Sequence, residues 1–380
     1  MSSPDDARWH AVGQVRSPRG KDGALQYGVS VQRLAIDTNA LYVSKAGVAR
    51  YVRNLLAGLR RLPPGTLDLT ELAWPVENFD YRQPMRAAKT FFREIIWSRL
   101  QAPRELVRRN IDLLHSPALP LVSPPATIRH VVTLHDLALL RHPERYRRWS
   151  RIMGPRHLNR LVRAQRLICV SRFTADEAME LLGLPAASLC VVHEGGDHLP
   201  PPVAPDFVVP GEFLLFVGSL EPGKNLELLR QAYAVARAAG KHLPPLLIVG
   251  ARWPAVAREG APPADWRYLG HLPDAVLAWL YRRAIALVFP SKYEGFGLPL
   301  VEAMQAGCPV ICSRVASLPE IGGEAVRWCE ATPAAYAEAM RELASDSAQR
   351  DAWIARGKLQ AAPFTWERCA RETAEIYRGL

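Results

Sequence analysis

Residues 284–310 read AIALVFPSKYEGFGLPLVEAMQAGCPV, an apolar run followed by a glycine-containing loop and a second apolar segment. The apolar run Ala284–Phe289 is short enough to form one buried strand. A glycine-containing loop follows, and Pro299 is a favoured first residue for the helix that comes next. A buried strand followed by a helix is typical of proteins that build parallel sheets with crossover helices. The stretch therefore predicts an α/β protein.

The chemistry of the same stretch points to a nucleotide sugar. A helix N-terminus with free backbone N–H groups, preceded by glycines that let a ligand approach, suits a phosphate. Glu294 and Glu302 lie on either side of it, and an ionised carboxylate accepts hydrogen bonds from hydroxyls. A phosphate site beside hydroxyl sites predicts a nucleotide sugar. The alternative is a helix end whose glutamates only complement the helix dipole.

The length of 380 residues predicts two domains, because one core seldom grows that large. The segment 198–205 is rich in proline and is typical of a linker. We expect a flexible extension over 1–30, a first domain over 31–199 and a second over 200–380, with the last helix packing back on the first. No apolar run reaches the roughly 20 residues of a membrane span. We expect no secretory signal, because the N-terminal residues include no apolar segment suitable for one.

Strand-like and helix-like patterns alternate along both predicted domains, which indicates two doubly wound, Rossmann-like domains that face a cleft. Ligands of such folds bind at the carboxyl ends of the strands. The expected strands are 33–37, 67–72, 111–114, 131–134, 167–170, 213–217, 245–249, 266–269, 286–289 and 309–312. The expected helices are 48–61, 90–109, 174–182, 226–239, 277–284 and 300–306.

The six cysteines are scattered without a Cys-x-x-Cys pair, which indicates neither a metal site nor a disulfide framework and fits a reducing cytoplasm. The net charge of +11 lies in the first half, where residues 1–200 hold 29 Lys and Arg against 18 Asp and Glu. Nine arginines fall between Arg141 and Arg166. This density predicts either contact with an anionic membrane or a solvated coat of arginine. Nucleic acid is not predicted, because no zinc finger, recognition helix or aromatic RNA-binding pattern accompanies the charge.

A second basic stretch, residues 86–99, mixes cations with Phe91, Phe92 and Trp97. Such a mixture suits an amphipathic surface on anionic headgroups. The competing interpretation is that these aromatic side chains pack into the core.

Two more segments carry candidate ligands. Residues 217–225, VGSLEPGKN, place Gly218 after a strand and give Lys224 as a point charge for a diphosphate. Residues 131–137, VVTLHDL, put His135 at the end of a strand and Asp136 where it can cap the next turn of the chain. Each signal is weak alone, since surface lysines and structural histidines are common.

Residues 294–304, EGFGLPLVEAM, resemble the Glu-x7-Glu signature of the retaining, GT-B-fold glycosyltransferase family that includes bacterial lipopolysaccharide and mannosyl transferases. The segments 217–225, 131–137, 46–52 and 307–321 are similar to the same family. The resemblance covers residues 31–380. It departs at Ser219, where many members place a phosphate-binding arginine.

The resemblance implies a role for each matched residue. His135 would lie beside the reacting sugar, Glu294 would bind its hydroxyls, and Lys224 would meet the diphosphate. The donor-binding set would be Gly47, Gly218, Ser219, Lys224, Leu272, Glu294, Gly295, Phe296, Gly297, Leu298 and Glu302, with Glu302 on the ribose. The segment around Ser171 and Thr174 is given a structural role as a strand end and helix cap.

The expected activity is transfer of a hexose, with mannose from GDP-mannose favoured over UDP-hexoses, to a hydroxyl of a cell-surface glycan or lipid-linked acceptor. No Asp-x-Asp or His/Asp cluster calls for a metal, and no cofactor is expected. We expect retention of configuration, and a double displacement through a carboxylate is the rival mechanism. The competing functions are a nucleotide-sugar epimerase and a non-catalytic nucleotide-sugar-binding partner. The location would be cytoplasmic, with peripheral contact at the inner face of the membrane.

Overall fold

The computed structural model describes residues 32–43, 47–74, 89, 92–145, 158, 160–251 and 263–380. The predicted extension over 1–30 lies outside the described residues. None of the helices in these ranges combines the length and apolar character that a membrane span needs.

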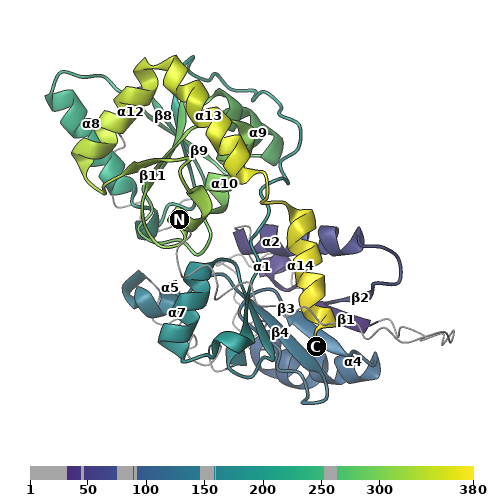
Figure 1. The fold of residues 1–380 in the computed structure, drawn as a ribbon. Coiled ribbons are helices and arrows are strands. Elements are labelled where there is room, and N and C mark those ends of the chain that lie inside the picture. Colours follow the sequence, from purple (N-terminus) through teal and green to yellow (C-terminus); the bar gives the residue numbers. More distant parts are fainter. Residues whose placement is uncertain are drawn as a thin grey trace, which may run out of the picture. The chain divides into compact units, whose positions relative to one another are not determined.

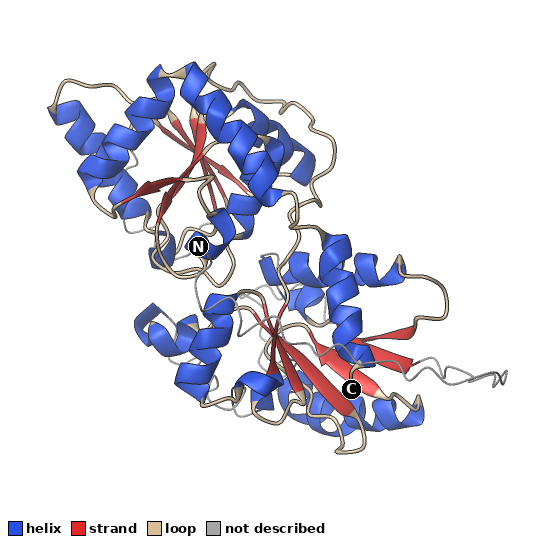
Figure 2. Ribbon diagram, viewed as in Figure 1, coloured by secondary structure: helices blue, strands red, loops and turns tan. Residues whose placement is uncertain are grey.

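The first half of the chain forms a six-stranded parallel sheet in the order β2-β1-β3-β4-β5-β6 (Figures 1 and 2). Strand β2 lies on one side of β1, and the strands from β3 onward lie on the other side. The strand order therefore reverses between β1 and β3. The strands are β1 Gln32–Asp37, β2 Leu67–Leu72, β3 Leu113–Ser116, β4 Arg129–Leu134, β5 Arg166–Cys169 and β6 Leu189–Val191.

The second half forms another six-stranded parallel sheet, in the order β12-β11-β10-β7-β8-β9. This is the strand order of a dinucleotide-binding Rossmann sheet, and its reversal lies between β7 and β10. The strands are β7 Leu214–Val217, β8 Leu246–Val249, β9 Trp266–Gly270, β10 Ala286–Phe289, β11 Val310–Ser313 and β12 Arg327–Cys329.

Helices cover the faces of both sheets (Figure 2), which is why the central strands are apolar on both sides. Those of the first half are α1 Ala40–Val43, α2 Gly47–Arg60, the π-helix η2 Phe92–Gln101, α4 Ala102–Arg108, α5 Ala138–Arg141, η3 Pro143–Arg145, α7 Arg172–Leu182 and η4 Ala186–Ser188. Those of the second half are η5 Pro222–Lys224, α8 Leu226–Ala238, α9 Asp274–Arg283, α10 Leu298–Ala306, α11 Leu318–Gly322, α12 Pro333–Ser345, α13 Ser347–Ala361 and α14 Trp366–Arg378.

The prediction of two doubly wound α/β sheets is confirmed. The boundary between residues 199 and 200 stays a prediction. The expected helix 90–109 is wrong in detail, because a π-helix precedes a separate α-helix that has Pro103 in its first turn. The short strands β6 and β12 were not predicted.

Helix α14 packs against α2, although more than 300 residues separate them. A Cβ on Gly58 of α2 would lie only 2.7 Å from the Cβ of Ala370. A glycine at this position therefore lets the two helices approach closely. The buried apolar face of α14 consists of Trp366, Cys369, Ala370, Ala374 and Tyr377.

Aromatic residues of the second basic stretch face inward. Trp97 is only 5% exposed, and its ring packs near Trp74, which also contacts Phe92. The interpretation of Trp97 as part of a membrane-facing surface is therefore wrong, because the side chain completes a core beneath β1 and β3. Phe91 lies outside the described residues.

Arginines near both ends of the Arg141–Arg166 stretch, Arg141 and Arg160 among them, also have protein partners. Arg141 forms ion pairs with Glu177 and Glu180 of α7. Arg160 donates to the carbonyl oxygens of Pro120 and Leu121. These contacts support the interpretation of this part of the stretch as a structural coat.

A buried polar chain runs through the first sheet. His115 Nδ1 lies 2.6 Å from the hydroxyl of Tyr377, and its Nε2 lies 2.9 Å from Thr133 Oγ1. Burial, with the charges of His130 and His135, lowers the pKa of His115 to about 3. Burial lowers the pKa of His130 to about 4. Both imidazoles therefore stay neutral in the folded protein at pH 5.

We expect acid to destabilise the fold through these two histidines. The unfolded chain takes up a proton on each near pH 6.5, whereas the folded chain does not until pH 3–4, so stability is lost as pH falls below 6.5. The loss should be about 2 kcal/mol for each histidine between pH 6.5 and pH 5. Urea unfolding at pH 7 and pH 5 measures it. His115→Gln should lose only about half as much free energy of unfolding between pH 7 and pH 5 as the wild type does. The exposed His242→Gln is the control and should lose as much as the wild type. Equal pH dependence in both variants would contradict the assignment.

Candidate active site

The candidate site lies at the carboxyl ends of β7 and β10, where the strand order of the second sheet reverses. Gly218 directly follows β7, and the loop that begins at Pro290 follows β10. In open parallel sheets this reversal leaves room for a ligand between two loops. The segments 217–225 and 290–302, chosen from the sequence, are thus brought together by the fold.

Lys224 and Glu294 form an ion pair within this site. Lys224 Nζ lies 2.5 Å from Glu294 Oε1, and the two side chains are 16% and 11% exposed. The hydroxyl of Ser291 donates to the same carboxylate oxygen at 2.6 Å. Burial would lower the pKa of Lys224, but the charge and hydrogen bond of Glu294 outweigh it and raise that pKa. The lysine is therefore a fixed positive charge at neutral pH.

Helix α10 begins four residues after Glu294 in the sequence. Gly297 caps the helix at φ 93°, a left-handed conformation that favours glycine. The side chains of Phe296 and Leu298 are buried. Within the described residues, the backbone N–H groups of Phe296, Gly297 and Leu298 donate to no protein acceptor. Free N–H groups at a helix N-terminus form a site for an anion.

Gly295 brings the loop against the first half of the chain. A Cβ on this glycine would lie 1.7 Å from the carbonyl oxygen of His135, which no real side chain allows. The carbonyl oxygen of Gly295 accepts hydrogen bonds from Ser171 at 2.6 Å and Thr174 at 3.2 Å. Ser171 also caps α7 by accepting from the N–H of Thr174, so the structural role predicted for this segment is confirmed.

Asp136 accepts a hydrogen bond from the backbone N–H of Ala138 at 2.9 Å, which confirms its predicted role at the start of α5.

His135, one residue earlier, has a polar partner at each ring nitrogen. Nδ1 lies 3.2 Å from Glu194 Oε1, and Nε2 lies 3.0 Å from the carbonyl oxygen of Pro117. Both partners are acceptors, so the doubly protonated ring satisfies both.

The pKa of His135 follows from these contacts. Burial would lower it, but the hydrogen bond and charge of Glu194 outweigh burial and raise it. Glu194 was missed by the sequence reasoning, since the strand β6 that precedes it was not predicted. The role of His135 beside a sugar stays a prediction, and a sugar hydroxyl would have to take the place of the Pro117 oxygen.

Glu302 is fully buried and surrounded by hydrogen-bond donors. Arg50 Nη1 lies 2.7 Å from its Oε1, and the hydroxyl of Tyr281 lies 2.9 Å from its Oε2. His198 Nε2 lies 3.2 Å from Oε1, close enough for an ion pair but without the geometry of a hydrogen bond. Burial would raise the pKa of Glu302, but His198, Arg50 and Tyr281 outweigh it and lower the pKa, so the carboxylate is ionised. Arg50 and His198 were not among the predicted site residues.

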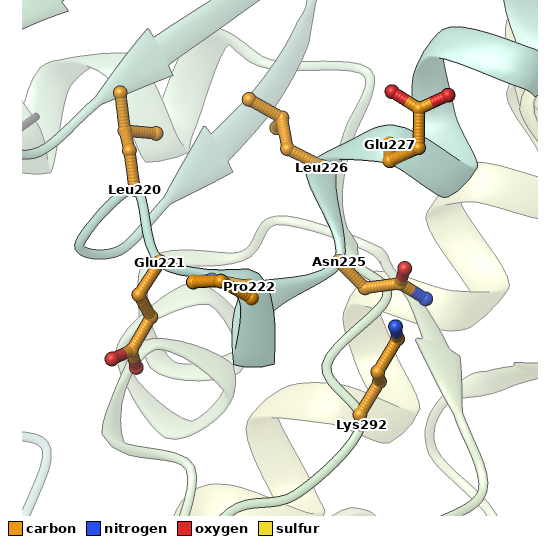
Figure 3. A pocket seen from close by; sticks show the side chains of 7 residues that line it. All are labelled: Leu220, Glu221, Pro222, Asn225, Leu226, Glu227 and Lys292. Atoms are coloured by element: carbon orange, nitrogen blue, oxygen red, sulfur yellow. The ribbon is translucent and has the colours of Figure 1, made fainter. Parts of the chain in front are cut away.

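Three further predicted residues lie at the ends of other strands or helices or next to them. Gly47 is the first residue of α2, and Ser219 lies in the turn that follows β7. Leu272 follows β9 and packs partly against the core. A small pocket at this turn is lined by Leu220, Glu221, Pro222, Asn225, Leu226, Glu227 and Lys292 (Figure 3). Lys224 and Glu294 do not line it, so this pocket is separate from their ion pair.

Two family models match this chain, one on each half. The model described as "Glycosyltransferase Family 4" matches residues 46–198, and that described as "Glycosyl transferases group 1" matches residues 206–360. The second match contains both loops of the candidate site.

Similar proteins include enzymes that transfer sugars. O-antigen chain mannosyltransferase B of Escherichia coli is 35% identical over 271 residues, which cover 66% of this chain and 71% of that protein. The serotype-specific mannosyltransferase WbdA of Escherichia coli is 27% identical over 277 residues, which cover 66% of this chain and 33% of WbdA. The chain thus spans about a third of the length of WbdA.

Solved structures share the fold. Sucrose-phosphate synthase from Thermosynechococcus elongatus aligns with a TM-score of 0.70 at 19% identity, over 92% of this chain and 98% of that one. WaaG, described as a glycosyltransferase involved in lipopolysaccharide biosynthesis, aligns with a TM-score of 0.62 at 18% identity. The alignment covers 91% of this chain and 100% of the WaaG chain. With both halves matched by family models and a relative at 35% identity, the chain belongs to the group 1 glycosyltransferases and has their two-domain GT-B fold.

Proposed function

We propose that the protein transfers mannose from GDP-mannose, with retention of configuration and without a metal ion, to a hydroxyl of a cell-surface glycan or lipid-linked acceptor. The proposal rests on the Lys224–Glu294 ion pair at the loop that leads into α10, whose first backbone N–H groups have no protein acceptor within the described residues. The similarity to an O-antigen chain mannosyltransferase supports the choice of mannose.

The ion pair suggests how the donor would be received. A diphosphate would replace Glu294 as the partner of Lys224, because both are anions. Glu294 would then be free to accept hydrogen bonds from the sugar hydroxyls. The loop thus has a cation for the phosphates and a carboxylate for the sugar within hydrogen-bond distance of each other.

The same groups would stabilise the transition state. As the sugar becomes cationic, the departing diphosphate gains negative charge, which Lys224 and the N–H groups at the start of α10 meet without rearrangement. His135, on the other side of Gly295, would donate a hydrogen bond to the sugar. In our proposal the acceptor oxygen bonds to the sugar carbon from the face that the diphosphate leaves, the bond from that carbon to the diphosphate breaks, and the hydroxyl proton passes to the departing diphosphate oxygen.

The nucleoside would lie farther along α10. Glu302 would bind the ribose, and backbone groups of Gly270–Pro273 would hold the base. Gly47, at the start of α2, would contact the phosphate or the acceptor through its backbone N–H.

A donor screen with a synthetic mannose-terminated acceptor tests this function. GDP-mannose, UDP-glucose and UDP-galactose are each incubated with the protein in EDTA, and NMR of the product gives the linkage. We expect GDP-mannose to give an α-mannoside, because retention keeps the α configuration that the mannose has in the donor. A changed sugar without transfer would indicate an epimerase, and a rise in melting temperature without turnover would indicate a binding protein. A β-mannoside, or a requirement for added metal, would contradict the proposed mechanism.

Peripheral contact with a membrane is also part of the proposal. Because Trp97 is buried, that side chain would take no part in the contact, which would draw on the basic residues of the first half. Co-sedimentation with anionic and neutral vesicles at low and high salt tests it, and binding that is insensitive to lipid charge would contradict it.

A further inference from the structure

Arg50 bridges two carboxylates of the second half of the chain. From the first turn of α2, its Nη1 donates to Glu302 on α10 at 2.7 Å, and its Nη2 donates to Asp274 at the start of α9 at 2.8 Å. The planar fork of a guanidinium suits such double recognition. Burial would lower the pKa of Arg50, but Glu302 and Asp274 outweigh it and raise the pKa further.

Of the three side chains against Glu302, Arg50 is the most exposed to solvent. The Tyr281 side chain is fully buried in the core. His198 is held from behind, since Trp366 Nε1 donates to its Nδ1 at 3.4 Å. The Arg50 side chain is 21% exposed, and it reaches Glu302 from another part of the sequence. Displacing it would leave the packing around Glu302 intact.

A ribose and Arg50 compete for the same acceptor. Ribose hydroxyls donate hydrogen bonds to a carboxylate, as Arg50 does, and Glu302 has no exposed surface while Arg50 is in place. If Glu302 binds the ribose, Arg50 must therefore leave it when the donor enters. Asp274, at 36% exposed, can be solvated once its partner is gone.

A displaced guanidinium would be available to a second anion, and the nucleotide donor supplies one in its diphosphate. The loop 218–225 supplies one cation, Lys224. A nucleoside diphosphate carries at least two negative charges, and guanidinium groups bind phosphate in a bidentate way. We propose that Arg50 is a donor-binding residue that exchanges Glu302 for the diphosphate when the ribose arrives. This inference rests on the proposed function of Glu302.

Calorimetric titration of nucleosides and nucleoside diphosphates tests the exchange. Guanosine, uridine, GDP and UDP are titrated into the wild-type protein, Arg50→Gln and Arg53→Gln, the last being an exposed arginine on the same helix. For the base that binds, Arg50→Gln should bind the diphosphate about tenfold more weakly, as expected for a lost charged hydrogen bond. The nucleoside affinity of Arg50→Gln should be equal to or higher than that of the wild type, because the guanidinium that competes with the ribose for Glu302 has been removed. Arg53→Gln should change neither.

A purely structural Arg50 would move both affinities in the same direction, and that result would overturn the proposal. Unchanged affinities in Arg50→Gln would overturn it as well. If Arg50→Gln does not fold, Arg50→Lys replaces it. A lysine keeps the charge but cannot bridge two carboxylates, so diphosphate affinity should be largely kept while nucleoside affinity rises, and loss of both would contradict the exchange. A wild-type protein that binds no nucleotide would refute the proposed function instead.

Discussion

Lys224→Ala should lower kcat/KM for the nucleotide sugar by about 10²–10³-fold while the protein remains folded. The reason is the loss of a fixed positive charge where the leaving diphosphate gains negative charge, an effect of about 2–4 kcal/mol when one such donor is removed. Steady-state rates over a range of donor concentrations measure it. Because the charge acts on the departing group, kcat should fall as well as donor affinity.

The control is Lys241→Ala, which removes an exposed lysine just after α8. It should keep wild-type kinetics. Glu294 retains its hydrogen bond from Ser291 in the Lys224 variant, so the loop after β10 keeps one of its anchors. Wild-type turnover by Lys224→Ala at both low and high donor concentration would show that the diphosphate binds elsewhere.

Gly295→Ala should reduce kcat by about 10²-fold or more. The new methyl group would meet the backbone oxygen of His135 at 1.7 Å and Asp136 Cβ at 3.0 Å, and backbone atoms cannot turn aside as a flexible side chain can. The loop must move by roughly 1 Å or more, and displacement of that size in an active site costs about two orders of magnitude in rate. Overpacking should also cost about 1–3 kcal/mol of stability.

Thermal unfolding and kcat are measured together for this variant. Gly211→Ala is the matched control, since a Cβ there meets nothing within 4 Å. We expect its melting temperature and rate to match those of the wild type. A Gly295→Ala protein with normal turnover would mean that the contact with His135 has no part in catalysis.

The sequence was a good guide to elements that have strong local signals. The apolar strands β7, β8 and β10 and the start of α10 lie within one or two residues of their predicted bounds. The strands β6 and β12, each of three residues, are too short to give a periodic pattern. The inward packing of Trp97 also has no local signal, because an aromatic residue among arginines suits a core face and a membrane face equally.

The site was predictable as segments but not as pairs. The motifs gave Lys224 and Glu294 separately, and their ion pair depends on the adjacency of β7 and β10. The bridge from Arg50 to Glu302 joins residues 252 positions apart, so only the topology of the whole chain brings them together. The pairing of His135 with Glu194 depends likewise on neighbouring strands β4, β5 and β6.

The packing of α14 on α2 has a consequence for the order of biosynthesis. During translation α2 emerges early, but the face that it buries against α14 stays uncovered until the residues 366–378 have left the ribosome. The hydroxyl of Tyr377, which bonds to His115 in the first sheet, arrives as late. The second half lies between these partners in the sequence and can complete its own sheet in the meantime. The half that is synthesised first is therefore the half that finishes folding last.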